Sequence, residues 1–418
     1  MTAFKGEVTM KARFLCFAIV ALALAVGSAQ AQTFNRLYTF NGDPDGANPV
    51  AGITIDRGGN LYGTTSAGGS AGFGSVYRLA PSGKSWSFSL LYGFQGFTEF
   101  SQDGGSPYSP VTIGPDGALY GTTRIGGNGG NGGGCREEHG CGTVYRLQPQ
   151  LGGAWRETVL YQFGYYDGEN PLYGDVVFDS SGSLYGATRN GGANSQGAVF
   201  RLTPWDGGWS ESVIHSFSGA DGSAPLGGPT IDSAGNLYGT TSLGGAEGYG
   251  VVYRLQPSAA NWATTVLHDF QGGDGVTPAS ALVLDSSGNI YGLTQAGGLS
   301  GEGNAFELTT GADGLWSLTT LYGFKGAGSQ GSYRTLATDG AGNWYGTTAS
   351  EGAYHMGSVF RLTLTNGAWN CKTVHDFTGG SDGANPYGVL SFDVNGNIYG
   401  TAEYGGKYGN GVVFQIIP

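Results

Sequence analysis

The chain has 418 residues and a net charge of −12 at neutral pH, although only 12% of its residues are charged. An acidic chain repels nucleic-acid phosphates and anionic membrane surfaces, so neither is an expected partner. Glycine is abundant, with 82 residues, but aromatic residues make up 13% and recur in register, which excludes a disordered polymer.

Residues 1–31 are predicted to be an export signal peptide. Lys11 and Arg13 precede an apolar run over residues 14–26, and Ala29-Gln30-Ala31 supplies the small residues that signal peptidase requires. The run is too short to cross a bilayer and no second one follows, so no membrane span is expected. We therefore expect cleavage near Ala31 and a secreted, periplasmic or cell-surface monomer, with residues 32–418 as a single domain.

A near-copy of Gly-Asn-Leu-Tyr-Gly-Thr-Thr recurs after this segment at intervals of 53 to 65 residues. Its tyrosines are Tyr62, Tyr120, Tyr185, Tyr238, Tyr291, Tyr345 and Tyr399. A period of this length, built from short β-rich segments and glycine turns, is typical of a repeat architecture. Each period contains four short segments that alternate apolar and polar residues, and it contains no helical pattern.

Four strands per period indicate an all-β fold, a seven-bladed β-propeller of four-stranded antiparallel blades. A β-helix would need shorter repeats, and separate β-sandwiches would need blocks of about 100 residues. The mature chain opens with a lone strand of the outermost type over residues 34–40 and ends with a lone strand of the third type over residues 412–417. We expect the N-terminal strand to join the last blade, so that the ring closes without a loose edge.

The residues that repeat within each period are expected to pack the blades together. The glycine after each repeated tyrosine is expected to let the neighbouring sheet approach closely. His215, His268 and His375 replace tyrosines of other outer strands and are expected to pack in the same way. Six tryptophans begin outer strands and are expected to lie between blades. They are Trp86, Trp155, Trp209, Trp262, Trp316 and Trp369.

The repeated unit Asp-x-x-Gly-Asn-Leu-Tyr-Gly-Thr-Thr, followed by Gly-Gly and Val-Tyr-Arg-Leu, resembles the GloVer tandem repeat of exported bacterial proteins. The similarity is strongest over residues 56–79 and 232–255 and covers nearly all of the mature chain. The resemblance implies an exported protein with propeller-like repeats. It implies no catalytic residues.

Two kinds of loop are expected to share the face around the central channel, namely those from each outer strand to the next innermost strand and those from second to third strands. Aspartates recur in the first kind and could gather Ca²⁺ or a cationic ligand. The alternative, which we expect, is that each caps its own turn and that no cofactor or metal is bound. The aspartates are Asp45, Asp103, Asp167, Asp221, Asp274 and Asp382.

Aromatic residues at and around these loops are candidates for stacking on sugar rings, beside polar neighbours. The tyrosines are Tyr108, Tyr173, Tyr333, Tyr387, Tyr404 and Tyr408, and the polar neighbours are Arg124, Arg189 and Glu403. The loop over residues 326–334 lacks the repeated Asp and Pro, and its Arg334 is placed to pair with a carboxylate at the channel mouth. The alternatives are packing between loops for the aromatic residues and neutral drift for the irregular loop.

Three cysteines follow the signal peptide. Cys135 and Cys141 bracket a short loop in an exported chain and are predicted to form a disulfide. Cys371 is then expected to be a small, buried apolar residue. The insertion over residues 126–141 is predicted to be a display loop, since its acidic and histidine residues lack metal-ligand spacing.

The sequence contains no Gly-x-Ser-x-Gly elbow, no Cys/His pair and no phosphate-binding loop. The leading hypothesis is an exported, non-catalytic scaffold that binds carbohydrate or a cell-surface protein. The alternative is a glycan-active hydrolase or lyase with its site at the channel mouth, and hydrolysis would need two acids near the axis. A third hypothesis is a ring that only mediates assembly between proteins.

Overall fold

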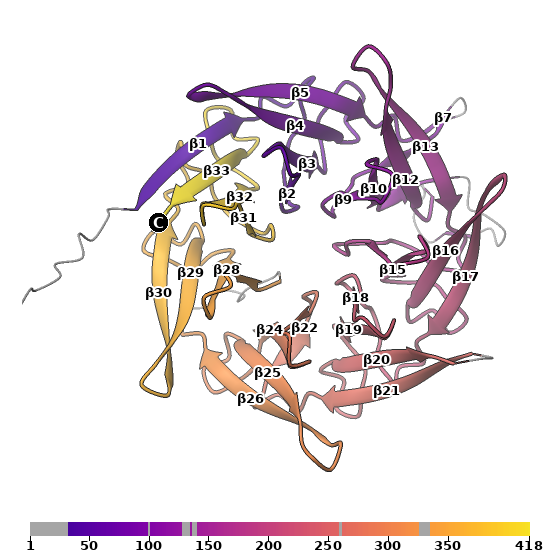
Figure 1. The fold of residues 1–418 in the computed structure, drawn as a ribbon, viewed down its shortest axis with the longest axis vertical. Coiled ribbons are helices and arrows are strands. Elements are labelled where there is room, and N and C mark those ends of the chain that lie inside the picture. The colour runs from indigo at the N-terminus through magenta and orange to yellow at the C-terminus, as the bar shows by residue number, and fades with distance from the viewer. Residues whose placement is uncertain (1–31, 99–100, 128–133, 136–139, 259–260, 326–334) are drawn as a thin grey trace, which may run out of the picture. The chain divides into compact units, whose positions relative to one another are not determined.

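The computed structural model describes residues 32–98, 101–127, 134–135, 140–258, 261–325 and 335–418. The chain divides into two compact units, 1–31 and 32–418, and the second contains all of the described residues. This unit is a ring of seven antiparallel sheets, each a blade of four main strands (Figure 1). The predicted all-β, seven-bladed propeller is confirmed. Across the described residues there is no helix with the length and apolar character needed to cross a membrane.

Each blade is built outward from a two-residue innermost strand, and the chain then crosses to the next blade. The innermost strands of blades 1 to 7 are β2 (Thr54–Ile55), β9 (Thr112–Ile113), β14 (Val177–Phe178), β18 (Thr230–Ile231), β23 (Val283–Leu284), β27 (Ala337–Thr338) and β31 (Ser391–Phe392). The second strands are β3 (Leu61–Thr65), β10 (Leu119–Thr123), β15 (Leu184–Thr188), β19 (Leu237–Thr241), β24 (Ile290–Ala296), β28 (Asn343–Thr348) and β32 (Ile398–Ala402).

The third and outer strands are longer. The third strands of blades 1 to 7 are β4 (Ser75–Ser82), β12 (Thr143–Pro149), β16 (Ala198–Trp205), β20 (Val251–Pro257), β25 (Asn304–Thr310), β29 (Ser358–Thr365) and β33 (Val412–Ile417). The outer strands are β5 (Ser85–Gly93), β13 (Trp155–Gln162), β17 (Gly208–Ser216), β21 (Trp262–Asp269), β26 (Trp316–Gly323), β30 (Ala368–Asp376) and β1 (Thr33–Thr39). Short accessory strands are β6 (Phe97–Thr98), β7 (Ser101–Gln102), β8 (Gly104–Gly105), β11 (Ile125–Gly126) and β22 (Val276–Pro278).

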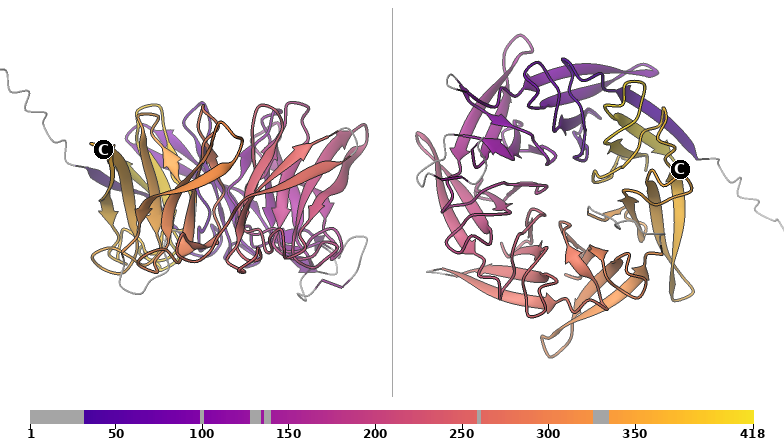
Figure 2. Two further views of the ribbon diagram at one scale, coloured as in Figure 1. Left: turned by 90° about the horizontal axis from the view of Figure 1, so that it is seen from below. Right: turned by 180° about the vertical axis from the view of Figure 1, so that it is seen from behind.

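The first and last strands complete blade 7 together, as predicted. Strand β1 pairs antiparallel with β33, with Thr33 opposite Ile417. On the inner wall, Thr401 Oγ1 donates a hydrogen bond to the carbonyl of Ala51 at 2.5 Å, which joins blade 7 to blade 1. The junction is therefore hydrogen-bonded at both the outer and the inner end of the blade, and the loops gather at the two faces of the ring (Figure 2).

Tyrosines of four second strands, those of blades 1, 2, 3 and 7, pack against the tryptophan of the outer strand of the next blade. Tyr62 of β3 lies edge-on to Trp155 of β13, with ring centroids 6.4 Å apart. Tyr399 makes the same contact with Trp86 across the closing junction, at 6.0 Å. The ring of His375 stacks on that of Phe34 at 4.1 Å. The packing roles predicted for these residues are confirmed, since each contact buries aromatic surface between blades.

The repeated glycines have a different role from the predicted one. Gly63 lies directly opposite Tyr77 in the pairing of β3 with β4, and a Cβ at Gly63 would be 2.3 Å from the Tyr77 hydroxyl oxygen. Gly400 has the same relation to Phe414 in blade 7. Each glycine therefore makes room for an aromatic ring of its own sheet, because opposed side chains on one face of a ladder are close neighbours.

Candidate ligand-binding cavity on the loop face

The loops that lead from each outer strand to the next innermost strand are shaped by a repeated proline. The residue before the proline has a positive φ, which is uncommon outside glycine and favours asparagine. These residues are Asn48 (57°), Ser106 (52°), Asn170 (56°), Ala224 (54°), Thr277 (56°) and Asn385 (53°). The proline packs on the glycine before a third strand, so that a Cβ at Gly411 would be 2.4 Å from Cδ of Pro49. The chain is thereby turned inward toward the channel mouth.

A cavity of about 460 Å³ lies among these inward-turned segments. Its apolar lining consists of residues that directly follow the repeated proline, namely Val50, Leu172, Leu226 and Ala279. Its polar and aromatic lining consists of Tyr108, Tyr173, Arg189, Gln295, Tyr387, Glu403 and Tyr404. Because these residues come from loops around the ring, no blade could form the cavity alone.

Two tyrosines and an arginine form one side of the mouth. The rings of Tyr108 and Tyr173 meet edge to face, with centroids 5.4 Å apart and planes at 86°. The guanidinium carbon of Arg124 lies 6.0 Å from the centroid of the Tyr108 ring. Tyr173 has a φ of 63°, a region that bulky residues rarely occupy and that costs about 1 kcal/mol or more. Backbone strain of this kind is concentrated at functional sites.

Tyr387, Glu403 and Tyr404 come from blade 7 and the loop that enters it, and they form the other side. The Tyr404 side chain remains 45% exposed. Burial, followed by the hydrogen bond and charge of Glu403, raises the pKa of Tyr404 to about 12. The Tyr404 hydroxyl is therefore protonated at neutral pH. Tyr387 and Tyr108 line the same cavity as Tyr404, so the two sides of the mouth face one space.

One repeated position, which directly follows the second strand in every blade except blade 5, where β24 extends past it, sets the charge of the mouth. In blades 1 to 7 it is Ser66, Arg124, Arg189, Ser242, Gln295, Ala349 and Glu403. Two cations on neighbouring blades therefore lie in one ring with a single acid on blade 7. Arg189 is exposed, and among the described residues no carboxylate forms an ion pair with its guanidinium.

The sequence of the repeats matches a family model. The model of the Gloeobacter/Verrucomicrobia repeat aligns with residues 25–171, 131–333 and 233–418. This chain belongs to that family. The resemblance noted from the sequence is therefore confirmed. No curated protein sequence matches the chain.

Two of the solved structures that resemble this Gloeobacter/Verrucomicrobia repeat protein bear on its fold. One is the extracellular domain of a putative one-component system from B. thetaiotaomicron, with 12% identity and a TM-score of 0.53 over 92% of this chain and 40% of that one. The other is a polysaccharide lyase, the ulvan lyase of family PL25, with 12% identity and a TM-score of 0.56 over 92% of this chain and 95% of that one. The chain spans about two fifths of the length of the first structure. At these identities the likeness shows the fold alone.

Of the nine residues predicted to bind a ligand in this repeat protein, six line the cavity. They are Tyr108, Tyr173, Arg189, Tyr387, Glu403 and Tyr404. Arg124 lies beside the cavity against Tyr108, whereas Tyr333 and Arg334 are outside the described residues. Tyr408 is 53% exposed and is not part of the lining. The centroid of its ring lies 4.9 Å from Nζ of Lys407. That these residues bind a ligand stays a prediction.

Five lining residues were not predicted from the sequence. They are Val50, Leu172, Leu226, Ala279 and Gln295. Four of them are apolar and carry no chemical signal of a site. Their position could nonetheless be read from the repeat, because the four apolar residues directly follow the repeated proline. Gln295 of β24 occupies the same position in the repeat as Arg189 and Glu403.

The six loop aspartates accept hydrogen bonds from their own loops and outer strands. Asp45 accepts one from the Tyr38 hydroxyl at 2.6 Å, and Asp274 lies 2.8 Å from Nε2 of His268. The carboxylates therefore lie over the outer strands, and the capping interpretation accounts for them. Within the described residues, no group of three or more His, Cys, Asp or Glu side chains is arranged to hold a metal ion.

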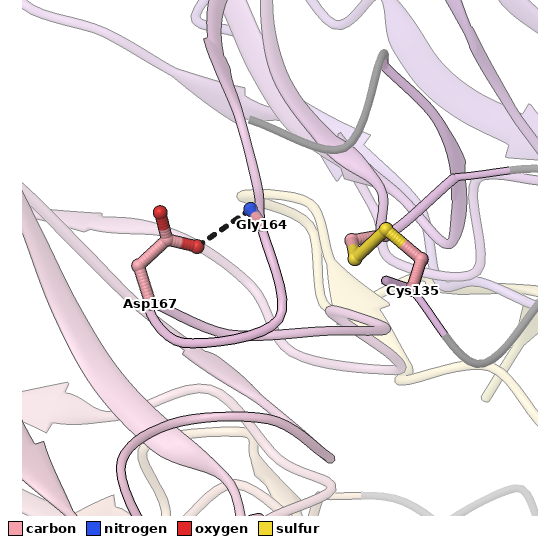
Figure 3. Close-up of a disulfide and its surroundings, with 4 residues drawn as sticks. Cys135, Gly164 and Asp167 are labelled. Atoms are coloured by element: carbon pink, nitrogen blue, oxygen red, sulfur yellow. Dashed lines mark hydrogen bonds between the residues drawn. A yellow bond between two sulfur atoms is a disulfide. The ribbon is translucent and has the colours of Figure 1, made fainter. Parts of the chain in front are cut away.

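The predicted disulfide between Cys135 and Cys141 is confirmed, with Cα atoms 5.3 Å apart (Figure 3). Cys141 is fully buried, and its carbonyl accepts the backbone N–H of Asn170 at 2.9 Å. Asn170 belongs to the loop that carries Tyr173, so the disulfide loop supports this side of the cavity. The predicted display loop falls mainly on residues 128–133 and 136–139, which are outside the described residues.

Cys371 of β30 is half-buried, not buried as predicted, because an outer strand keeps one side toward solvent. It packs against the core between blades 5 and 6. Burial, followed by the charge of Glu351, raises the pKa of its thiol to about 11. The thiol is therefore protonated at neutral pH and is a poor nucleophile, so Cys371 acts as a packing residue.

Proposed function

We propose that this protein is an exported, non-catalytic propeller that binds carbohydrate in the loop-face cavity. The observation that carries the proposal is a cavity of about 460 Å³ whose lining includes four tyrosines. Tyrosine offers an apolar face to the C–H groups of a sugar and a hydroxyl for hydrogen bonding. Arg189, Gln295 and Glu403 add the donors and acceptors that suit a ligand rich in hydroxyl groups.

Export is part of the same proposal. Residues 1–31 have the composition of a signal peptide, and we propose cleavage near Ala31. The disulfide between Cys135 and Cys141 supports an oxidising compartment, since such bonds are rare in the cytosol. The mature protein would then meet glycans in the periplasm, at the cell surface or in the medium.

A glycan-cleaving enzyme is the second candidate, because a polysaccharide lyase shares the fold. Hydrolysis through two acids requires carboxyl groups about 5–10 Å apart across the scissile bond. The described lining of the cavity provides one carboxylate, that of Glu403. This lining favours binding over hydrolysis.

The proposal is tested with the exported protein on a glycan array, followed by calorimetric titration of each glycan that binds. We expect Tyr404→Ala to raise the Kd about tenfold or more, because truncating an aromatic anchor commonly costs about 2 kcal/mol. Tyr408→Ala is the matched control, since Tyr408 is exposed to a similar degree, 53% against 45%, and lies outside the cavity lining. Equal losses in the two variants, or the absence of any bound glycan, would refute the proposal.

The same titrations separate binding from catalysis. Each glycan that binds is incubated with the protein and its chain length is then measured by mass spectrometry. An unchanged chain length supports the non-catalytic proposal. Shortened products that require the intact cavity would replace it with the second candidate.

A further inference from the structure

We infer that the loop-face cavity selects an anionic glycan, and that Arg189 holds the carboxylate or sulfate group of one sugar. The inference rests on the proposed function and adds the class of carbohydrate. Its basis is the position, exposure and unmatched charge of one side chain.

Arg189 is held at the cavity wall by its backbone. It directly follows β15, and its N–H donates to the carbonyl of Asn170 at 3.0 Å. The side chain is exposed and lines the cavity. Among the described residues, no acid pairs with its guanidinium. Within the described part of the chain, the Arg189 guanidinium is therefore a charge on this wall that the protein itself leaves unmatched.

A guanidinium presents its N–H groups as a planar fork that matches two oxygens of a carboxylate or sulfate. The hydroxyl groups of neutral sugars can also accept these N–H groups, but they carry no charge, so their hydrogen bonds to the guanidinium are weaker. The chain as a whole has a net charge of −12, so its long-range field does not attract anions. Selection of an anion must therefore come from this local contact.

The rest of the mouth gives the ligand an orientation. Tyr108 and Tyr173 stand on the side of blades 2 and 3, where Arg124 adds a second cation. Glu403 and Tyr404 stand on blade 7, and the carboxylate of Glu403 would repel a second anionic group. We therefore place the charged sugar against Arg189 and a neutral, hydroxyl-rich sugar against Glu403.

The test uses four tetrasaccharides titrated into the exported protein. They are tetragalacturonate, its full methyl ester, a sulfated carrageenan tetrasaccharide and neutral cellotetraose. We expect an anionic probe to bind most tightly and Arg189→Met to weaken it about tenfold or more, since hydrogen bonds to charged groups are the strong ones. Arg189→Met should weaken binding of the methyl ester less than binding of tetragalacturonate. Arg189→Lys should bind the anionic probe with an affinity between those of the wild type and Arg189→Met, because it keeps the charge and loses the fork.

Arg57→Met is the matched control. Arg57 is an exposed arginine in the turn after β2, on the opposite face, so its removal changes the net charge equally and leaves the cavity intact. We expect it to leave all four affinities unchanged. Preference for tetragalacturonate identifies a uronate, and preference for the carrageenan probe identifies a sulfate ester.

Two results would overturn the inference while leaving the proposed function in place. One is tighter binding of cellotetraose or the methyl ester than of either anionic probe. The other is an equal loss for neutral and anionic probes in Arg189→Met. If the wild type binds none of the probes and nothing on the glycan array, the proposed function fails and this inference fails with it.

Discussion

Glu157 lies at the interface of blades 1 and 2, and removal of its charge should stabilise the protein at neutral pH. It is on outer strand β13, opposite Leu147. Its Oε1 atom is buried without a hydrogen-bond partner among the described residues. Burial, with a smaller contribution from the charge of Asp103, raises the pKa of Glu157 from 4.5 to about 8. The perturbation we consider is Glu157→Gln, which keeps the shape and removes the ionisation.

Proton linkage determines whether ionisation of Glu157 stabilises or destabilises the folded protein. The folded protein binds the Glu157 proton more tightly than the unfolded chain, so ionisation opposes folding. Below about pH 4.5 both states carry the proton and the group costs nothing. As the pH rises from 4.5 toward about 8, stability is lost. At about 1.36 kcal/mol per unit, the loss approaches about 3 kcal/mol at pH 7.

The loss of about 3 kcal/mol is an upper limit, because a half-buried side chain can relax toward water. We therefore expect Glu157→Gln to raise the free energy of unfolding by about 1–3 kcal/mol at pH 7. At pH 4 the two proteins should be equally stable. The assay is denaturant unfolding of both proteins from pH 4 to pH 8, with the disulfide intact. Glu247→Gln, which removes an exposed carboxylate, is the control and should change the free energy little. A difference that does not grow with pH would refute the reasoning.

Two further predictions concern the ring and its repeated glycine. Deletion of residues 33–40 should lower the thermal midpoint of the whole propeller in one transition, because β1 supplies the outer partner of β33; two separate transitions would show that blade 7 does not close the ring. Gly63→Ala should destabilise by roughly 1–3 kcal/mol in denaturant unfolding, because its Cβ would overlap the buried Tyr77 ring. Gly273→Ala, where a Cβ would meet no atom within 4 Å, is its control, and equal effects of the two would contradict the packing argument.

Much of the candidate site was predictable, because the repeat shows where each residue lies within its blade as well as which residue type it is. Tyr108 and Tyr387 follow the repeated proline, whereas Arg189 and Glu403 follow the second strand. Both positions belong to loops on the same face of the propeller, so the strand order of a blade is enough to place these residues together. The role of the glycine after each tyrosine was predicted wrongly. Its neighbour, such as Tyr77 for Gly63, depends on the cross-strand register, which a count of residues along one strand does not report.

The sequence by itself determined the number of blades, the four strands of each and the closure of the ring by β1. These properties depend on strand pairing and burial along the chain, and both impose a periodic pattern of residue types on the sequence. Only the tertiary structure decided that six predicted residues share one cavity, that Glu157 is half-buried near Asp103, and that Arg189 has no acid partner among the described residues. Contacts of this kind depend on the radius and twist of the closed ring, which bring together side chains from different repeats, and no local pattern records those distances.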